Sequence, residues 1–341
     1  MKLQVKWLEP FQFFEMGYVT SFLAPGFVKK AEQQLASDER PELLVVAGNQ
    51  ETPSIDARVE LERQPSAGFL VLSDEELRHK FRPYRKAQYV LRNYFQPAWR
   101  ARNVYTLPLG YNSDFVGMRE ELPLQPAERA QVWSFVGQIK QEREKMVKVF
   151  DNLGPHALFA AQSFNDPDGI SGRELFLMYS ASYFVLCPFG NRSPDSFRVM
   201  EALEAGAIPV TVKFLGTDHN RLVFGDHPFV VGKDWAHARD LVQSLLSDTE
   251  GLEAKREEVT AWYDGYRAML FHDVEKIVSG NRRADLASAQ FRYQLRASRG
   301  PVIQLKYFLH YSKRGRRLLR FFREALNTVV LRSGLGKLVK S

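Results

Sequence analysis

Short apolar segments recur along this chain, and polar or turn-forming residues bound each of them. Such segments are typical of buried strands, whereas apolar residues that recur every three or four positions indicate helices. The pattern predicts strands at Leu43–Ala47, Phe69–Leu72, Tyr89–Leu91, Val104–Leu107, Val132–Val136, Ala157–Ala160, Tyr183–Cys187, Ile208–Val212 and Phe229–Val231. It predicts helices at Glu142–Leu153, Arg173–Ser180, Pro194–Gly206, Trp235–Leu246 and Leu252–Ile277.

The alternation of strands and helices predicts an α/β fold with parallel sheets that are covered on both faces. A stretch flanked by Pro123 and Pro126 interrupts the alternation. We therefore expect two Rossmann-like domains, residues 1–125 and 126–280, followed by an extension at 281–341. Ligands of such domains bind at the carboxyl ends of strands, so the cleft between the two domains is the expected site.

Charge is distributed unevenly along the sequence. Residues 281–341 hold 15 Lys and Arg against 2 Asp and Glu, a net charge of +13 in a chain of net charge +7, so residues 1–280 carry −6. A nucleic-acid enzyme would carry basic residues across its body, so nucleic acid is not an expected partner. The single cysteine, Cys187, excludes an internal disulfide. Neither a signal peptide nor a transmembrane segment is expected, which favours a cytoplasmic protein.

The segment from Tyr183 to Val212 has the turn and capping residues expected of one complete βαβ unit. Pro188 ends the strand, Ser193 and Pro194 suit the N-cap and first position of a helix, and Gly206 ends that helix. A helix N-terminus presents unpaired N–H groups and a positive dipole. The segment therefore predicts a site for a diphosphate.

Side chains of the same segment add to this predicted anion site. Arg198 offers a fixed charge for a phosphate. Glu201 and Glu204 follow on the same helix, where a carboxylate would accept hydrogen bonds from ribose hydroxyls. Spacing alone leaves open a surface ion pair between Arg198 and Glu201, worth roughly a few tenths of a kcal/mol. The neutral donors at the site are Asn191, Ser193 and Ser196.

The stretch Cys187–Val210 resembles the signature of exostosin-like glycosyltransferases, glycosyltransferase family 47, where it marks the nucleotide-sugar site. Weaker similarity continues upstream in Trp133–Lys140 and in Arg92–Tyr94 with Leu107–Tyr111, the last two being similar to members of the ribitol xylosyltransferase type. The matching positions of the signature are Cys187, Pro188, Gly190, Asn191, Ser196, Arg198, Glu201, Ala202, Leu203, Ala205, Gly206, Ile208, Pro209 and Val210.

The resemblance implies a GT-B fold, inversion at the anomeric carbon and chemistry that needs neither a metal nor another cofactor. It adds Gly137 and Arg143 to the donor-binding candidates. One Asp-x-Asp triplet occurs, Asp166–Asp168, and its proline and glycine context predicts a turn rather than a metal site.

An inverting transfer also needs a base that takes the proton of the acceptor hydroxyl. The candidates are Asp74 and Glu75, which follow a predicted strand, and Glu15; Asp74 is the first choice. Each is alternatively a helix cap or a solvated charge. Arg92 is a candidate for an anionic sugar or a phosphate, although a core-edge arginine is favoured. The histidines, including His219, are interpreted as structural.

The extension at 281–341 predicts a basic amphipathic helix. Such a helix lies on anionic lipid, at the inner face of the membrane, or packs back on the body with its arginines in solvent. Its apolar positions are Leu318, Phe321, Phe322, Ala325 and Val329, and the interleaved arginines are Arg316, Arg317, Arg320 and Arg323.

Together these features predict an inverting glycosyltransferase of polysaccharide biosynthesis. Its donor is a nucleotide sugar, with a UDP-sugar favoured, and its acceptor is a cell-surface glycan or a lipid-linked oligosaccharide. The alternative is a non-catalytic partner that binds a nucleotide sugar within a glycan assembly complex. An epimerase would carry a Gly-rich dinucleotide fingerprint after its first strand, and the sequence has none.

Overall fold

A computed structural model describes most of the chain from Gly68 onward and isolated parts of the remainder. The described residues are 5–7, 18, 43–47, 68–72, 74–75, 87–95, 103–122, 129–163, 169–278, 294, 296–297, 300–312, 314–315, 317–318 and 321. The chain forms two compact units. The larger comprises Met1–Phe95 with Ala101–Gln294, and the smaller comprises Gln96–Arg100 with Leu295–Ser341.

The first sheet of the larger unit is parallel, and its strands lie in sequence order, β1-β2-β3-β4-β5. The side chains of β3 and β4 are buried throughout, as expected for strands covered on both faces. The strands are β1 (Val5–Trp7), β2 (Leu43–Ala47), β3 (Gly68–Leu72), β4 (Val90–Arg92) and β5 (Val104–Thr106).

The second sheet is also parallel but has the order β10-β9-β8-β6-β7. The chain moves from β6 outward to β7, then returns to the other side of β6 to form β8. Strand order therefore reverses at β6 and β8, and the carboxyl ends of those two strands form a topological switch point. The strands are β6 (Gln131–Val136), β7 (His156–Phe159), β8 (Ser182–Leu186), β9 (Ile208–Val212) and β10 (Val230–Gly232).

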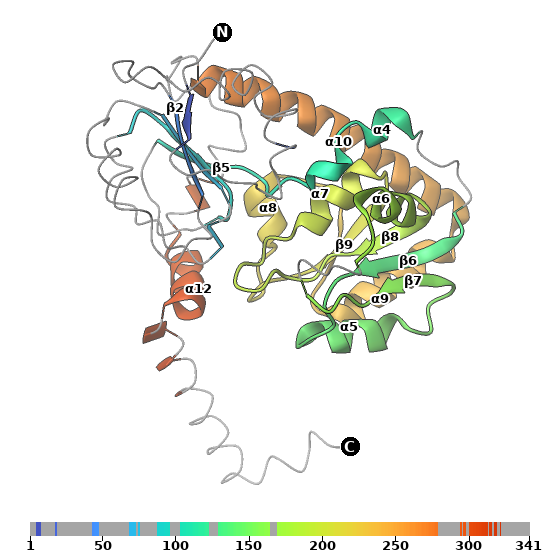
Figure 1. Ribbon diagram of the computed structural model, residues 1–341. Helices are drawn as coiled ribbons and strands as arrows, with labels where there is room; N and C mark the ends of the chain where they lie inside the picture. The colour runs from blue at the N-terminus through green and yellow to red at the C-terminus, as the bar shows by residue number, and fades with distance from the viewer. Residues whose placement is uncertain are drawn as a thin grey trace. The chain divides into compact units, whose positions relative to one another are not determined.

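Helices cover both faces of the second sheet (Figure 1). Helices α5 and α9 pack together on one face, and α6 and α7 pack on the other. Trp133 of β6 is fully buried and donates its indole N–H to the Phe150 carbonyl at 3.0 Å, which ties α5 to the core. The helices are η3 (Ser113–Phe115), α4 (Met118–Glu121), α5 (Glu142–Phe150), α6 (Gly172–Ser180), α7 (Phe197–Glu204), α8 (His219–Phe224), α9 (Trp235–Leu246) and α10 (Thr249–Val278).

The predicted α/β class and the predicted strands are confirmed, with strand ends shifted by one residue at most. Strand β1 escaped prediction because it has only three residues, of which the central one is Lys6. Helix α8 was missed as well. The predicted break at Pro123–Pro126 lies outside the described residues.

The predicted start of the helix after β8 is wrong. Helix α7 begins at Phe197 with Ser196 as N-cap, rather than at Pro194 with Ser193 as N-cap. The Ser193 hydroxyl is engaged by the Asp195 carboxylate, so it does not cap a helix. The helix ends as predicted, with Gly206 at φ +67°, a conformation that glycine adopts at low cost.

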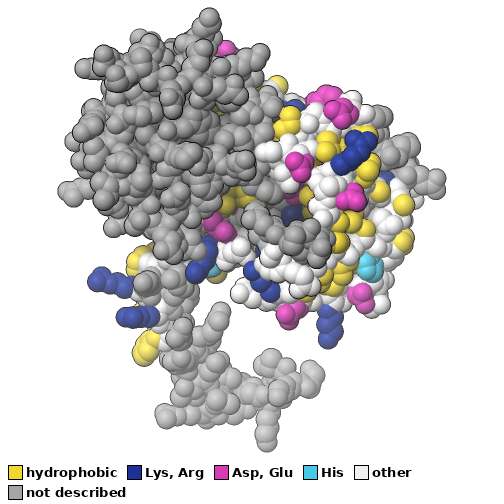
Figure 2. Space-filling model, viewed as in Figure 1, with side chains coloured by type: hydrophobic (Ala, Val, Ile, Leu, Met, Phe, Trp, Pro, Cys, Tyr) yellow, Lys and Arg dark blue, Asp and Glu magenta, His cyan; other side chains and the backbone are white. Residues whose placement is uncertain are grey.

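The smaller unit contains α12 (Pro301–Tyr311), which exposes apolar side chains. Val302, Leu305 and Phe308 are 62%, 56% and 47% exposed. Residues 300–321 include no Asp or Glu, and Figure 2 shows hydrophobic and basic side chains together on the described part of this segment. Leu318 and Phe321 are exposed too, whereas most of the predicted tail helix lies outside the described residues. Among the helices that the structure describes, none has the length and apolar character needed to cross a bilayer.

Candidate functional site

A cavity of about 260 Å³ opens at the switch point of the second sheet. Its wall includes the loop after β6, the loop after β8 and the first turn of α7. Glu75, Tyr94 and Leu109 also line it. Of the predicted donor-binding residues, those that line the cavity are Gly137, Arg143, Asn191, Ser196, Arg198 and Glu201.

Arg198 ties the first turn of α7 to the end of β6. Its Nε donates to the Val136 carbonyl at 2.7 Å, and its guanidinium lies 5.0 Å from the centre of the Phe135 ring. Gly137 makes room for this arrangement. A Cβ at that position would lie 2.1 Å from Arg198 Nη2, and φ is +143°.

Arg143 brings a second guanidinium to the same wall. It donates to the Gln138 carbonyl at 3.1 Å and to the Phe189 carbonyl at 2.7 Å, so it joins the loops after β6 and β8. Burial, and then the neighbouring charge of Arg198, lower the pKa of Arg143 to about 10. Two cations held this close in a partly buried cavity favour an anionic ligand.

The N-terminus of α7 reaches the cavity without a side-chain cap. Ser196 is the N-cap residue, yet its hydroxyl makes no capping hydrogen bond and accepts from Arg198 Nη1 at 3.4 Å instead. Ser196, Phe197 and Arg198 all line the cavity. The partial positive charge of the helix terminus therefore adds to that of the guanidiniums.

The two predicted ribose-binding carboxylates are in different surroundings. Glu201 lines the cavity, and burial raises its pKa to about 7, opposed by Arg198 and by the Asn112 N–H. Glu204 is also buried but is not part of the cavity wall. Its carboxylate accepts from the Tyr263 hydroxyl at 2.7 Å and lies 3.5 Å from Arg267. The structure thus brings only Glu201 to the cavity.

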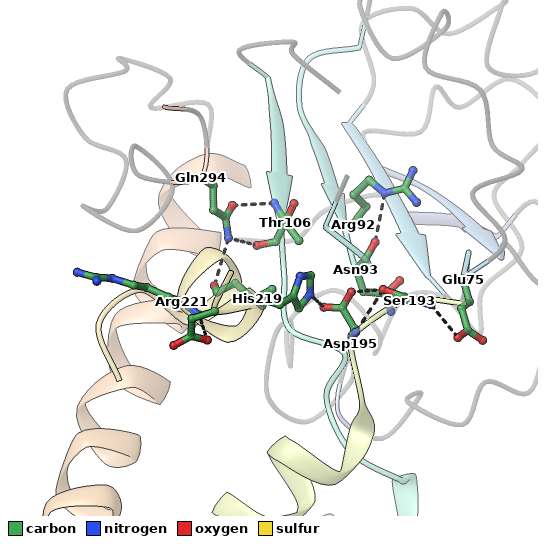
Figure 3. A network of polar contacts seen from close by, with 11 residues as sticks. Glu75, Arg92, Asn93, Thr106, Ser193, Asp195, His219, Arg221 and Gln294 are labelled. Atoms are coloured by element: carbon green, nitrogen blue, oxygen red, sulfur yellow. Dashed lines mark hydrogen bonds and ion pairs between the residues drawn. The ribbon is translucent and has the colours of Figure 1, made fainter. Parts of the chain in front are cut away.

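A buried polar chain supports the loop after β8, as Figure 3 shows. Ser193 donates its hydroxyl to Asp195 Oδ2, and Asp195 Oδ1 lies 3.0 Å from His219 Nε2. His219 is the first residue of α8 and is nearly inaccessible. The sequence analysis assigned no site role to Asp195 or His219. The only sequence signal was the acidic residue within the motif segment, because its partner lies 24 residues farther on in an unpredicted helix.

Adjacent carboxylates after β3 have different partners. Asp74 is fully buried and lies 3.0 Å from Arg92 Nη2, which is fully buried too. Asp74 and Arg92 form an internal ion pair and are not part of the cavity wall. Glu75 does line the cavity, and its Oε1 accepts from the Arg192 and Ser193 N–H groups at 2.6 and 3.2 Å.

Two other predictions concern residues that the structure does not describe. Glu15 and the Asp166–Asp168 triplet both lie outside the described residues. Within the described ranges, no group of three or more His, Cys, Asp or Glu side chains is arranged to hold a metal ion. Independence from metal stays a prediction.

The chain matches no protein-family model and no curated protein. Solved structures with a similar chain course include an α1,3-fucosyltransferase, at 13% identity and a TM-score of 0.48, which covers 82% of this chain and 90% of that one. An α1,3-fucosyltransferase with GDP has 12% identity and a TM-score of 0.46, over 82% of this chain and 90% of that chain. Anabaena Alr3699/HepE in complex with UDP and glucose has 12% identity and a TM-score of 0.44, over 70% of this chain and 78% of that chain.

Two of these similar structures are fucosyltransferases and the third holds UDP and glucose, but each TM-score is below 0.5. A function for this chain has to rest on its own residues. The resemblance of Cys187–Val210 to exostosin-like glycosyltransferases stays a prediction.

Proposed function

We propose that this protein is an inverting glycosyltransferase that binds a nucleotide sugar in the cavity at the switch point. One observation carries the proposal. Arg143, Arg198 and the uncapped N-terminus of α7 converge on one cavity wall, where Glu201 supplies a buried carboxylate. This set offers positive charge for a diphosphate and an acceptor for ribose hydroxyls.

The proposed donor site uses Arg198 and the α7 N-terminus to stabilise the charge that develops on the departing diphosphate. Asn191 and Ser196 supply further polar groups on the same wall. Ser193 has a supporting role in the loop, because its hydroxyl donates to the Asp195 carboxylate. Glu204 is left out of the proposed site, because Tyr263 and Arg267 hold its carboxylate.

We assign the base to Glu75, because its carboxylate lines the cavity and that of Asp74 is paired with Arg92. The acceptor hydroxyl oxygen forms a bond to the anomeric carbon, and the bond from that carbon to the diphosphate oxygen breaks. The electron pair leaves with the diphosphate, and the hydroxyl proton goes to Glu75. A single displacement of this kind inverts the anomeric centre.

The expected domain division, with an acceptor-side domain at 1–125 and a donor-binding domain at 126–280, is part of this proposal. Glu75 and the donor residues would then come from different domains, and the cavity would be the GT-B cleft. The proposal further includes a UDP-sugar as donor, a glycan or lipid-linked acceptor, and chemistry that needs no metal.

The exposed face of α12 supports a second part of the proposal, that residues 281–341 hold the protein on anionic membranes. Val302, Leu305 and Phe308 are apolar and exposed, and residues 300–321 are basic without an acidic residue. Such a surface gains apolar burial and attraction to anionic headgroups together. The full-length protein should sediment with phosphatidylglycerol vesicles, and Leu305→Ser with Phe308→Ser should release it. Unchanged sedimentation would contradict the membrane role.

The main proposal is tested by measuring thermal shifts with UDP-, GDP-, CMP- and dTDP-sugars, followed by assays for donor turnover. We expect one nucleotide class to raise the melting temperature and its sugar to be transferred to an acceptor or to water. A shift without any turnover favours the non-catalytic binding partner. No shift with any of the four would refute nucleotide-sugar binding at this cavity.

A further inference from the structure

One carboxylate oxygen occupies two backbone N–H groups of the loop after β8. Glu75 Oε1 lies 2.6 Å from the Arg192 nitrogen and 3.2 Å from the Ser193 nitrogen. Consecutive backbone N–H groups aimed at one oxygen form a common binding arrangement for anions. This pair belongs to the loop that the proposed function assigns to the donor diphosphate. Glu75 therefore occupies groups that a phosphate oxygen would also use.

The loop has the shape to admit this carboxylate. A Cβ on Gly190 would lie 2.9 Å from Glu75 Oε1 and 2.7 Å from the Asp195 carbonyl oxygen, so a larger residue would displace one of them. The Ser193 hydroxyl points to Asp195, as Figure 3 shows, while its backbone N–H points to Glu75. The Asp195 pairing with His219 keeps the loop in this conformation.

The charges around the cavity explain why an anion is held here. Arg198 is close enough to disfavour the charge of Arg143, and Glu75 acts on Arg143 in the opposite sense. Glu75 is thus a counter-charge for the cationic wall. A diphosphate carries more negative charge and more acceptor oxygens than one carboxylate, so it is the stronger partner for the same groups.

We propose that Glu75 is an internal competitor of the donor diphosphate for the Arg192 and Ser193 N–H groups. The carboxylate and the phosphate oxygen exclude each other there, so binding of the donor releases Glu75 into the cavity. This inference rests on the proposed function, which assigns Glu75 as the base. The release would make the base available only when a donor is bound.

Competition of this kind has a measurable cost in affinity. The apparent dissociation constant equals the intrinsic one divided by the fraction of molecules that are competent to bind. If Glu75 holds the N–H pair in about nine molecules out of ten, nucleotide affinity is lowered about tenfold. Removing the competitor should therefore tighten nucleotide binding, whereas removing a group that merely supports the loop should weaken it.

The test is calorimetric titration of the full-length protein with UDP and with GDP. Glu75→Gln removes the charge and leaves a neutral amide oxygen, which is a weaker acceptor for the N–H pair, so binding should tighten by up to about tenfold. Glu75→Asp keeps the charge but is one methylene too short for the N–H pair, and it should tighten binding about threefold. Glu142→Gln is the matched control. Glu142 Oε1 accepts from the Phe189 N–H at 3.0 Å, a similar bond to the same loop, but Glu142 does not line the cavity. Because Glu142 supports the loop and does not compete with a ligand, the affinity of this variant should not rise above that of the wild type.

Each alternative result has a defined meaning. Unchanged or weaker binding by Glu75→Gln overturns the competitor role, as does equal tightening by Glu142→Gln. Tightening by the glutamine variant without tightening by the aspartate variant shows charge repulsion alone and also overturns it. If the wild type and Glu75→Gln bind neither nucleotide, the proposed function itself fails, and the competitor role fails with it.

Discussion

The segments that follow β8 and β3 both deliver charged side chains to the ends of parallel strands, but they do so in different ways. After β8, one contiguous βαβ unit supplies Asn191, Ser196, Arg198 and Glu201 to a single cavity. After β3, the neighbouring residues Asp74 and Glu75 separate, one into a buried ion pair and one to the cavity wall.

The two segments differ in how far along the chain the residues lie that position each charged side chain. Helix geometry within 183–212 fixes where Arg198 and Glu201 lie. Asp74 is fixed by Arg92, 18 residues away, and Glu75 by Arg192, 117 residues away. Turn and capping residues therefore predict a site that is built by one βαβ unit. Which of two adjacent carboxylates reaches the cavity depends instead on contacts with distant segments.

The largest expected effect concerns Glu75. Because a positioned general base contributes roughly 10²–10⁴-fold to a rate, Glu75→Gln should lower kcat for sugar transfer by that factor at saturating donor. Asp74→Asn should keep near-normal kcat in whatever fraction of the protein folds. Single-turnover transfer measured on the two variants checks this difference, and the reverse ranking would return the base to Asp74.

The second effect is on stability. Removing one partner of a buried ion pair leaves an uncompensated charge, so Asp74→Ala should lower the free energy of unfolding by about 3–5 kcal/mol. The double variant Asp74→Leu with Arg92→Met should recover most of that loss, since neither charge stays buried alone. Urea unfolding measures both. A loss below about 1 kcal/mol in the single variant would be too small for a buried pair.

A smaller effect on nucleotide affinity is expected from the residues that support the loop after β8. His219→Gln removes a group that holds Asp195 but touches nothing in the proposed donor. We expect nucleotide affinity to fall by about threefold to tenfold, as for loss of one hydrogen bond of about 1 kcal/mol. Isothermal calorimetry checks it. His237 accepts from the Lys233 N–H in the exposed segment before α9 and does not line the cavity, so His237→Gln should leave the affinity intact.

The smallest effect is a pH dependence. Burial raises the pKa of Glu201 to about 7, so near neutrality the carboxyl is partly protonated. Ribose hydroxyls that donate to it favour the ionised form, so nucleotide affinity should rise severalfold from pH 6 to pH 8. The terminal phosphate titrates in the same range. The informative quantity is therefore the difference in slope between the wild type and Glu201→Gln, and equal slopes would remove the ribose role.

The sequence predicted the parallel α/β architecture and nearly all strands, because each strand is a short apolar run with clear ends. It also predicted Gly137, Arg143, Arg198 and Glu201 as one group, which the structure places around one cavity. It misplaced the start of α7, because the hydroxyl of Ser193 is equally suited to capping a helix and to bonding Asp195.

What the sequence could not provide depends on contacts between distant segments. His219 lies in the short helix α8, whose six residues give too little periodicity to predict. Glu204 lies one helical turn after Glu201 on α7, but its carboxylate contacts Tyr263 and Arg267 of α10 instead of the cavity. Such partners follow from packing and not from local pattern.

The central claim is that Arg198 binds the diphosphate of a nucleotide sugar. Its most direct test is calorimetric titration of the preferred nucleoside diphosphate into the wild type, Arg198→Ala and Arg221→Ala. Arg221 is an exposed arginine of α8 that pairs with Asp226 and does not line the cavity. Charge-assisted hydrogen bonds contribute about 1.5–3 kcal/mol, so Arg198→Ala should weaken binding roughly tenfold to hundredfold, while Arg221→Ala binds normally. Wild-type affinity in a folded Arg198→Ala protein would contradict the account.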